Sequence, residues 1–136
     1  MILLDTNAVI EIINGTSVPV RATFDLRLAQ GDAITVSAIV IHELEYGVAK
    51  SQRRKFNSDL LHGFLSGPVD ILAFDGEDAA TAGAIRAALE AKGTPIGPYD
   101  VLIAGQALRH KATLVTANTR EFKRIKGLKV EDWAKS

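Results

Sequence analysis

Short apolar runs alternate along the chain with longer segments in which apolar residues recur every three or four positions. The runs at residues 1–4, 33–36, 69–74 and 113–116 have the length of buried strands. The longer segments predict helices at residues 8–13, 18–30, 38–50, 51–65, 79–92 and 99–110. A helical turn at 120–122 and a short edge strand at 128–130 complete the prediction.

This alternation of strands and helices predicts an α/β fold. Strands separated by helices of ten or more residues form parallel sheets with right-handed crossovers. We therefore expect a parallel sheet of four to five strands with helices on both faces. No repeat, low-complexity tract or linker interrupts residues 1–136, so a single domain is predicted.

Composition limits the function classes. Apolar residues make up 47% of the chain, and 16 basic residues balance 16 acidic ones, so any nucleic-acid binding must come from local patches. The absence of cysteine excludes disulfides, a thiolate nucleophile and a cysteine zinc site. No signal-peptide pattern or apolar run of about 20 residues is present. We expect a soluble cytoplasmic protein.

Candidate chemistry begins where the first strand ends. Four apolar residues are followed by Asp5, Thr6 and Asn7, and then by a helical pattern. Asp5 therefore lies at the carboxyl end of a strand, where open parallel sheets bind ligands. The structural alternative is that Asp5 only caps the following helix.

Two further acids lie beside apolar segments. Glu43 falls on the shoulder of the buried face of its helix, where a carboxylate loses solvation and needs a partner, unless the side chain is simply exposed. Asp100 is in the first turn of a helix and precedes the apolar run 101–104. Favourable interaction with the helix dipole is the alternative explanation for Asp100.

A fourth polar position follows the strand at 113–116. Thr116 and Asn118 end this strand, and Glu121 lies three residues later. Ordinary turn chemistry is the alternative explanation. If these strand and helix ends converge, three carboxylates would share a pocket and repel one another. A hard divalent cation, Mg²⁺ or Mn²⁺, would stabilise such an oxygen-only group and would favour phosphate-ester chemistry.

The same segments resemble the PIN-domain nucleases, and more closely the VapC-type toxins of bacterial toxin–antitoxin pairs. The resemblance rests on four motifs in order and covers essentially the whole chain. The motifs are Leu3–Asn7, Ser37–Gly47 containing Glu43, Tyr99–Ala104 and Leu114–Phe122; the stretch Lys126–Trp133 is also similar to the ending of these toxins.

This resemblance implies a PIN-like fold and a Mg²⁺-dependent endoribonuclease, with Mn²⁺ as the other candidate cation. The metal-binding acids would be Asp5, Glu43 and Asp100. The fourth acidic position of the family falls on Asn118, a departure that puts a fully occupied second metal site in doubt. Side chains expected to support these ligands are Thr6, Asn7, Thr116 and Glu121.

The resemblance also implies partners. These are an RNA substrate, with the tRNA anticodon loop as one candidate, a VapB-type antitoxin that blocks the acidic pocket, and a second copy of the chain. The helix at 56–65 is one candidate dimer interface. Operator DNA would be contacted only through the antitoxin, and no membrane is expected.

Local basic clusters are the candidate RNA contacts. Arg120, Lys123 and Arg124 adjoin Asn118 and are expected to contact the RNA backbone. The cluster at 50–55 is interpreted as solvated surface charge. The three histidines, His42, His62 and His110, are interpreted as surface or packing residues.

Two rival functions stay open at this stage. An aspartyl phosphatase would use Asp5 as nucleophile, but such enzymes usually carry a second Asp where Asn7 stands. A catalytically silent PIN interaction module is the other, and Asn118 is the feature in its favour.

Overall fold

Five short strands form one parallel sheet in the computed structural model, which describes residues 1–135. They are β1 (Ile2–Leu4), β2 (Ile34–Ser37), β3 (Asp70–Leu72), β4 (Thr113–Val115) and β5 (Lys129–Glu131), in the order β3-β2-β1-β4-β5. The central β1 pairs with β2 and β4, so that Leu4 lies opposite Val36 and Val115. The predicted parallel α/β sheet is confirmed, with five strands.

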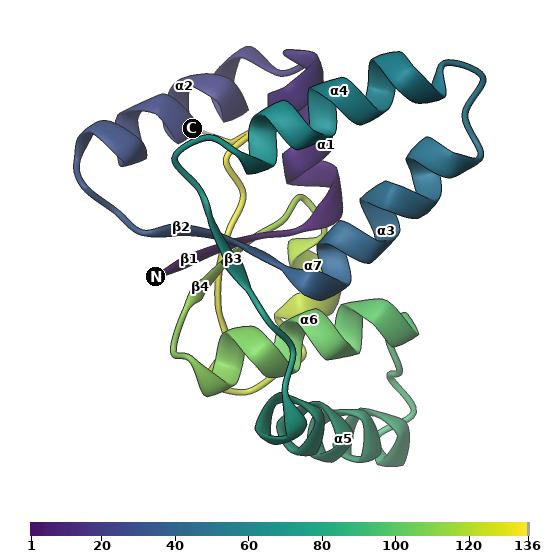
Figure 1. The fold of residues 1–136 in the computed structure, drawn as a ribbon. Helices are drawn as coiled ribbons and strands as arrows, with labels where there is room; N and C mark the ends of the chain where they lie inside the picture. The colour runs from purple at the N-terminus through teal and green to yellow at the C-terminus, as the bar shows by residue number, and fades with distance from the viewer. Residues whose placement is uncertain (136) are drawn as a thin grey trace.

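Helices cover both faces of this sheet (Figure 1). Along residues 1–135 they are α1 (Thr6–Asn14), α2 (Val18–Ala29), α3 (Ala38–Ala49), α4 (Arg54–Leu65), α5 (Gly76–Ala91), α6 (Pro98–Arg109) and α7 (Thr119–Phe122). Figure 1 shows α1, α2 and α4 on one side of the strands and α6 on the other, with α5 packed against α6 as an outer layer.

Side-chain caps explain where several helices begin. Asp5 accepts a hydrogen bond from the Ala8 N–H at 2.8 Å and caps α1, and Ser37 caps α3 by accepting from the Ile39 N–H at 3.0 Å. Asp5 directly follows β1 and Ser37 is the last residue of β2, and the backbone passes from extended to helical conformation at both positions. The carboxyl edge of the sheet is therefore also the start of α1 and α3.

Two helices start three residues away from the predicted position, and the other boundaries differ by at most two. The fourth helix begins at Arg54 rather than Ser51, because Ser51 closes α3 through its N–H and hydroxyl, both donated to the Val48 carbonyl. The fifth helix begins earlier than expected, at Gly76, because Asp75 and Asp78 form a reciprocal capping box.

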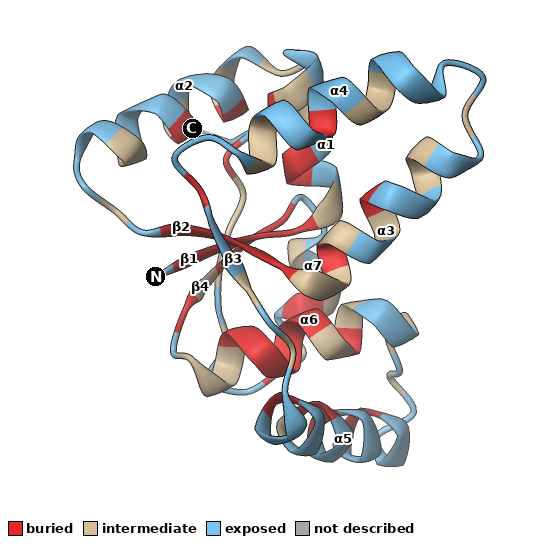
Figure 2. Cartoon of the chain, in the orientation of Figure 1, coloured by how far each residue is buried: buried red, intermediate tan, exposed pale blue. Residues whose placement is uncertain are grey.

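The core lies around the central strands, which are buried in Figure 2, whereas β3 is an exposed edge strand. On the α6 side, Gly105 allows α5 and α6 to touch, since a Cβ at this position would lie 2.6 Å from the Cα of Ala82. Within residues 1–135, no helix combines the length and apolar character needed to cross a bilayer.

Candidate active site

The three predicted acids lie at or near the amino ends of three helices. Asp5 follows β1 directly, Glu43 lies in the second turn of α3 after β2, and Asp100 lies in the first turn of α6. The charges of Asp5 and Glu43 both raise the pKa of Asp100, which places the three carboxyl groups within electrostatic reach of one another. The three acids therefore influence one another electrostatically, and their joint role as a metal site stays a prediction.

Asp5 is the most enclosed of the three, with 8% of its surface exposed. Burial raises the pKa of this carboxyl, and the charges of Glu11 and Glu43 add to the increase. The Thr116 side chain and the Ala8 N–H lower the pKa by hydrogen bonding, without cancelling the effect of burial. Glu11, one of the charges acting on Asp5, was not predicted from the sequence, although it lies on the same helix.

Thr6 fixes Glu43. The Thr6 hydroxyl donates a 2.8 Å hydrogen bond to Oε1 of Glu43, a contact that joins the first turn of α1 to α3. This hydrogen bond leaves Oε2 of Glu43 without a hydrogen bond to residues 1–135. The supporting role predicted for Thr6 thus has a defined geometry, because the bond limits the rotation of the carboxylate.

Asp100 carries the largest perturbation in the site. Burial and the charges of Glu43, Asp5 and Glu121 raise the pKa of Asp100 from 3.8 to about 6. Gly97 keeps this carboxylate unobstructed, since a Cβ at residue 97 would lie 3.3 Å from Oδ2 of Asp100. Raised pKa values caused by neighbouring acids are characteristic of functional carboxylate groups.

The fourth position is organised differently. Thr116 is buried and its hydroxyl accepts a hydrogen bond from the Asn118 N–H at 3.0 Å. Asn118 is exposed, and its amide donates to Oε2 of Glu121 at 2.6 Å. Asn118 therefore holds Glu121, whose charge reaches Asp100, instead of supplying a charge of its own.

The donor chemistry of the site fits a hard divalent cation. Asp5, Glu43 and Asp100 offer only carboxylate oxygens, and no basic side chain is among the causes that shift the pKa values of Asp5 and Asp100, which burial raises first. Within residues 1–135, no three Asp, Glu or His side chains lie close enough together to hold a metal ion in this conformation. The protein thus supplies mutually repelling ligands that a cation would stabilise.

The remaining predicted residues lie around this site or beside it. Asn7 is exposed at the start of α1, and Arg120 and Lys123 are exposed on and after α7. Arg124 is partly buried and donates to the carbonyl of Pro95 at 3.4 Å, in the loop before α6. An aromatic contact was not predicted: the rings of His42 and Tyr99, neighbours of Glu43 and Asp100, lie 5.6 Å apart.

A second group of acids lies at the other end of α6. Asp78 is fully buried, and its carboxylate accepts hydrogen bonds from Arg109 at 2.8 Å and Gln106 at 3.0 Å. Arg109 also pairs with Asp75 and Glu77. Burial acts to raise the pKa of Asp78, but the hydrogen bonds from Arg109, the Asp75 N–H and Gln106 lower the pKa overall.

The family model of the PIN domain matches residues 2–128. This chain belongs to the PIN-domain family. The PIN domain described here is 42% identical over 132 residues to the tRNA(fMet)-specific endonuclease VapC of Shigella flexneri, with 97% of each chain covered. It is 41% identical to ribonuclease VapC2 of Rickettsia felis, with 98% of each chain covered.

Solved structures agree with this assignment. VapBC2 from Rickettsia felis bound to a promoter DNA fragment matches with a TM-score of 0.90 and 40% identity, over 98% of this chain and 99% of that one. DNA-bound VapBC from Salmonella typhimurium matches with a TM-score of 0.88 and 40% identity, over the same shares. The PIN domain is therefore an endoribonuclease of the VapC type, and PIN nucleases generally depend on a divalent metal.

Proposed function

We propose that this chain is a Mg²⁺-dependent endoribonuclease toxin that hydrolyses tRNA phosphodiester bonds and is inhibited by a VapB-type antitoxin. The observation that supports the proposal is the hydrogen bond that joins Thr6, next to Asp5, to Glu43, together with the raised pKa values of Asp5 and Asp100, to which burial and the charge of Glu43 both contribute. Membership in the PIN family favours RNA hydrolysis over the aspartyl phosphatase alternative.

Each acid has a separate task in this proposal. Asp5 and Asp100 would hold the cation; Glu43, oriented by Thr6, would accept a hydrogen bond from the attacking water. When bound, the cation would polarise the scissile phosphate and favour deprotonation of the water. Mg²⁺ and Mn²⁺ both suit a set of oxygen donors completed by a substrate phosphate, and Mg²⁺ is the cation proposed first. Thr116 would keep Asp5 in place.

The proposed substrate is an exposed tRNA loop, the anticodon loop being the first candidate. The PIN relatives from Shigella flexneri and Salmonella typhimurium carry names that specify tRNA(fMet). Single-stranded loops expose both the phosphate and the bases to an enzyme. Arg120 and Lys123, exposed next to Asn118, would contact the RNA backbone.

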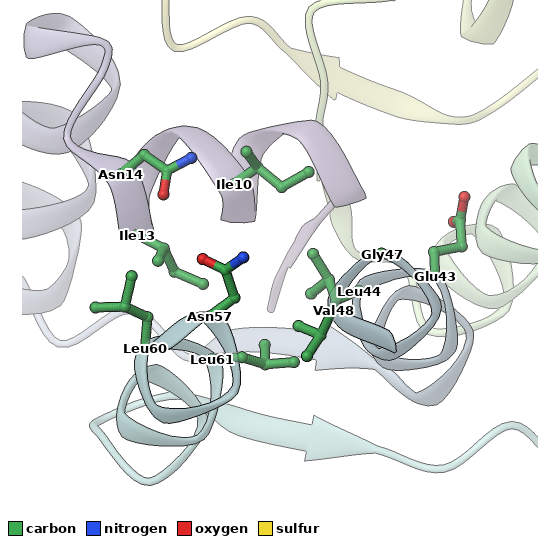
Figure 3. A pocket seen from close by; sticks show the side chains of 10 residues that line it. All are labelled: Ile10, Ile13, Asn14, Glu43, Leu44, Gly47, Val48, Asn57, Leu60 and Leu61. Carbon is green, nitrogen blue, oxygen red and sulfur yellow. The ribbon is translucent and has the colours of Figure 1, made fainter. Parts of the chain in front are cut away.

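An apolar cavity beside the acids is the proposed antitoxin site. The cavity of about 280 Å³ lies between α1, α3 and α4, and Figure 3 shows Glu43 at one end of it, with the carboxylate directed away from the apolar side chains. The apolar lining includes Ile10, Leu44 and Leu60. An antitoxin segment could fill this cavity and place a basic side chain against the acids. Contact with operator DNA would then be made through the antitoxin.

A homodimer is also proposed, although α4 offers less surface for it than expected. Leu61 is buried in the core, and Phe64 and Leu65 pack against the core. Phe56 and Leu60 are the exposed apolar side chains of this helix. Light scattering of the purified chain would measure the oligomeric state.

Cleavage of total tRNA by the purified chain tests the proposed function. We expect Mg²⁺-dependent cleavage that stops on chelation of the metal and resumes when Mg²⁺ is restored. Asp5→Asn should abolish cleavage, since a neutral amide binds the cation poorly. Asp25→Asn is the matched control, because Asp25 is an exposed acid on α2 paired with Arg21.

Two outcomes would contradict the proposal. Full cleavage by Asp5→Asn would exclude the carboxylate mechanism. A wild-type chain that binds RNA but cleaves none of it with Mg²⁺ or Mn²⁺ would leave the silent interaction module as the function. Mapping the cut ends would decide whether the anticodon loop is the target.

A further inference from the structure

Exposed aromatic and basic side chains form a line along α3 that begins at the acid site. His42, Tyr46 and Lys50 are spaced four residues apart, so they lie on one side of α3. Tyr99 extends the line across to α6 through its ring contact with His42. We call His42, Tyr46, Lys50 and Tyr99 the α3 stripe. All four are exposed, with 61% of Tyr46 and 46% of Tyr99 accessible to solvent.

The stripe is continuous with the catalytic region. His42 precedes Glu43 and Tyr99 precedes Asp100 in the sequence, so the contact between the two rings lies next to both acids. Lys50 is seven residues after Glu43, which places it on the same side of the helix and about 10 Å further along the axis. A strand of RNA held at the acids would therefore meet the stripe as it leaves the site.

The charge of the stripe is positive at its far end. The Lys50 ammonium lies 4.7 Å from the centre of the Tyr46 ring, and beyond it the Arg53 guanidinium lies 4.0 Å from the centre of the Phe56 ring. Among residues 1–135, no ion pair joins Lys50 or Arg53 to a carboxylate. The nearby Glu45 is engaged by His62 on α4. Both cations are therefore available for phosphate groups.

We propose that the α3 stripe binds the single-stranded segment of the RNA that flanks the scissile phosphate. Bases would stack on Tyr99, His42 and Tyr46, and Lys50 would contact the backbone. Flat exposed rings interleaved with cations suit single-stranded RNA, since stacking needs unpaired bases and cations attract phosphates. The sequence pattern alone had favoured a solvated role for the basic cluster at 50–55, because it does not reveal the pairing of Lys50 and Arg53 with aromatic rings.

This inference rests on the proposed function, and binding without metal separates the two. The probe is a labelled unstructured RNA of about 12 nucleotides, with chelator present, and its anisotropy gives the Kd. Tyr46→Leu should weaken binding about tenfold, because it removes one stacking surface. Tyr46→Phe keeps the ring and should bind within about twofold of wild type. Lys50→Ala should also lower the salt dependence of binding, while Lys92→Ala, directly after the last residue of α5, is the charge-matched control.

Cleavage with Mg²⁺ supplies the second readout. For the 12-nucleotide RNA, Tyr46→Leu should raise KM about tenfold with kcat nearly unchanged, and for a trinucleotide it should change neither constant. If Tyr46→Leu and wild type bind RNA with equal affinity, the stripe does not bind RNA, even if wild type cleaves RNA normally. Loss of a dimer in Tyr46→Leu with unchanged RNA affinity would identify the stripe as a protein interface instead. Absence of RNA binding by wild type would also overturn the inference.

Discussion

Two groups of acids lie at opposite ends of α6, and their chemistry differs. At the carboxyl end of the helix, Asp78 is fully buried and yet has a lowered pKa, because Arg109 and Gln106 donate hydrogen bonds to it. At the amino end, Asp100 is only partly buried and its pKa is raised to about 6, with Glu43 and Asp5 adding negative charge.

The difference separates a structural group from a functional one. Burial of a charged group is tolerated when a partner of opposite charge and hydrogen bonds compensate it, as at Asp78. Asp5, Glu43 and Asp100 receive no compensating positive charge from the described part of the chain. Unpaired acids that lie close together destabilise the metal-free fold, and a bound cation would offset this cost. Unpaired acids therefore indicate a functional site, whereas acids paired with Arg109 and Gln106 indicate a structural one.

The largest expected effect is loss of cleavage in Asp100→Asn. Replacing a proposed cation ligand should lower the cleavage rate by more than about 100-fold. Residues that only support a metal ligand typically change activity by up to about 100-fold, so a ligand should exceed that loss. Asp75→Asn, in the other acid group, keeps a helix-capping side chain at the start of α5 and should stay within about twofold of wild type. Rates of RNA cleavage for both variants test the distinction, and similar losses in both would remove it.

The second effect concerns stability. Asp78→Ala removes the buried acceptor of Arg109 and Gln106 and one half of the α5 capping box. We expect the free energy of unfolding to fall by about 2–3 kcal/mol. Urea denaturation measures this change, and Asp59→Ala, an exposed acid on α4, is the control. A fall below about 0.5 kcal/mol would show that the network is not stabilising.

The two groups should respond to pH in opposite directions in the metal-free protein. The raised pKa of Asp100 contributes stability below the unfolded value of 3.8, and this contribution is lost as pH rises through about 6. Asp100→Asn should therefore be more stable than wild type above pH 6, and the difference should vanish near pH 4. The lowered pKa of Asp78 contributes stability above 3.8 that is lost as pH falls further.

Thermal unfolding of both variants between about pH 3 and 8 tests these signs. The destabilisation of Asp78→Ala should stay constant at neutral pH and shrink only below about pH 4. If Asp100→Asn is no more stable than wild type at pH 8, neither burial nor repulsion by Glu43 and Asp5 destabilises the Asp100 carboxylate.

Most of the fold follows from the sequence because its signals are local. Strand ends at Asp5 and Ser37 coincide with helix caps, and Gly105 allows the close packing of α5 on α6. The boundary of α4 was less predictable, since Ser51 bonds to Val48 on the helix before it rather than capping the one after it. A serine hydroxyl can end one helix or cap the next, so the sequence around Ser51 does not show which of the two it does.

The sequence suggests which acids belong to the candidate site, but it does not give the contacts that orient them. An acid that ends a strand of a parallel sheet lies at the ligand-binding edge, which singles out Asp5 without coordinates, whereas Asp100 in the first turn of α6 is singled out only by the apolar run after it. The bond from Thr6 to Glu43 and the ring contact of His42 with Tyr99 join elements 37 and 57 residues apart in the chain, and periodicity along one helix carries no information about them. Such cross-element contacts depend on how α3 packs against α1 and α6.

The smallest expected effect is at Asn118, where the chain departs from the acidic pattern of its family. Asn118→Asp would remove the hydrogen bond to Glu121 and place a fourth carboxylate near Asp100. Without metal the added repulsion should lower Tm slightly, since residue 118 is exposed and water screens the charges. With Mn²⁺ present, the same charge should tighten cation binding about threefold to tenfold. Calorimetric titration measures the affinity, and Asn118→Ala, which loses the bond without adding charge, should not tighten it. Unchanged affinity in Asn118→Asp would mean that position 118 does not reach the cation, so that the acid site is complete with three carboxylates.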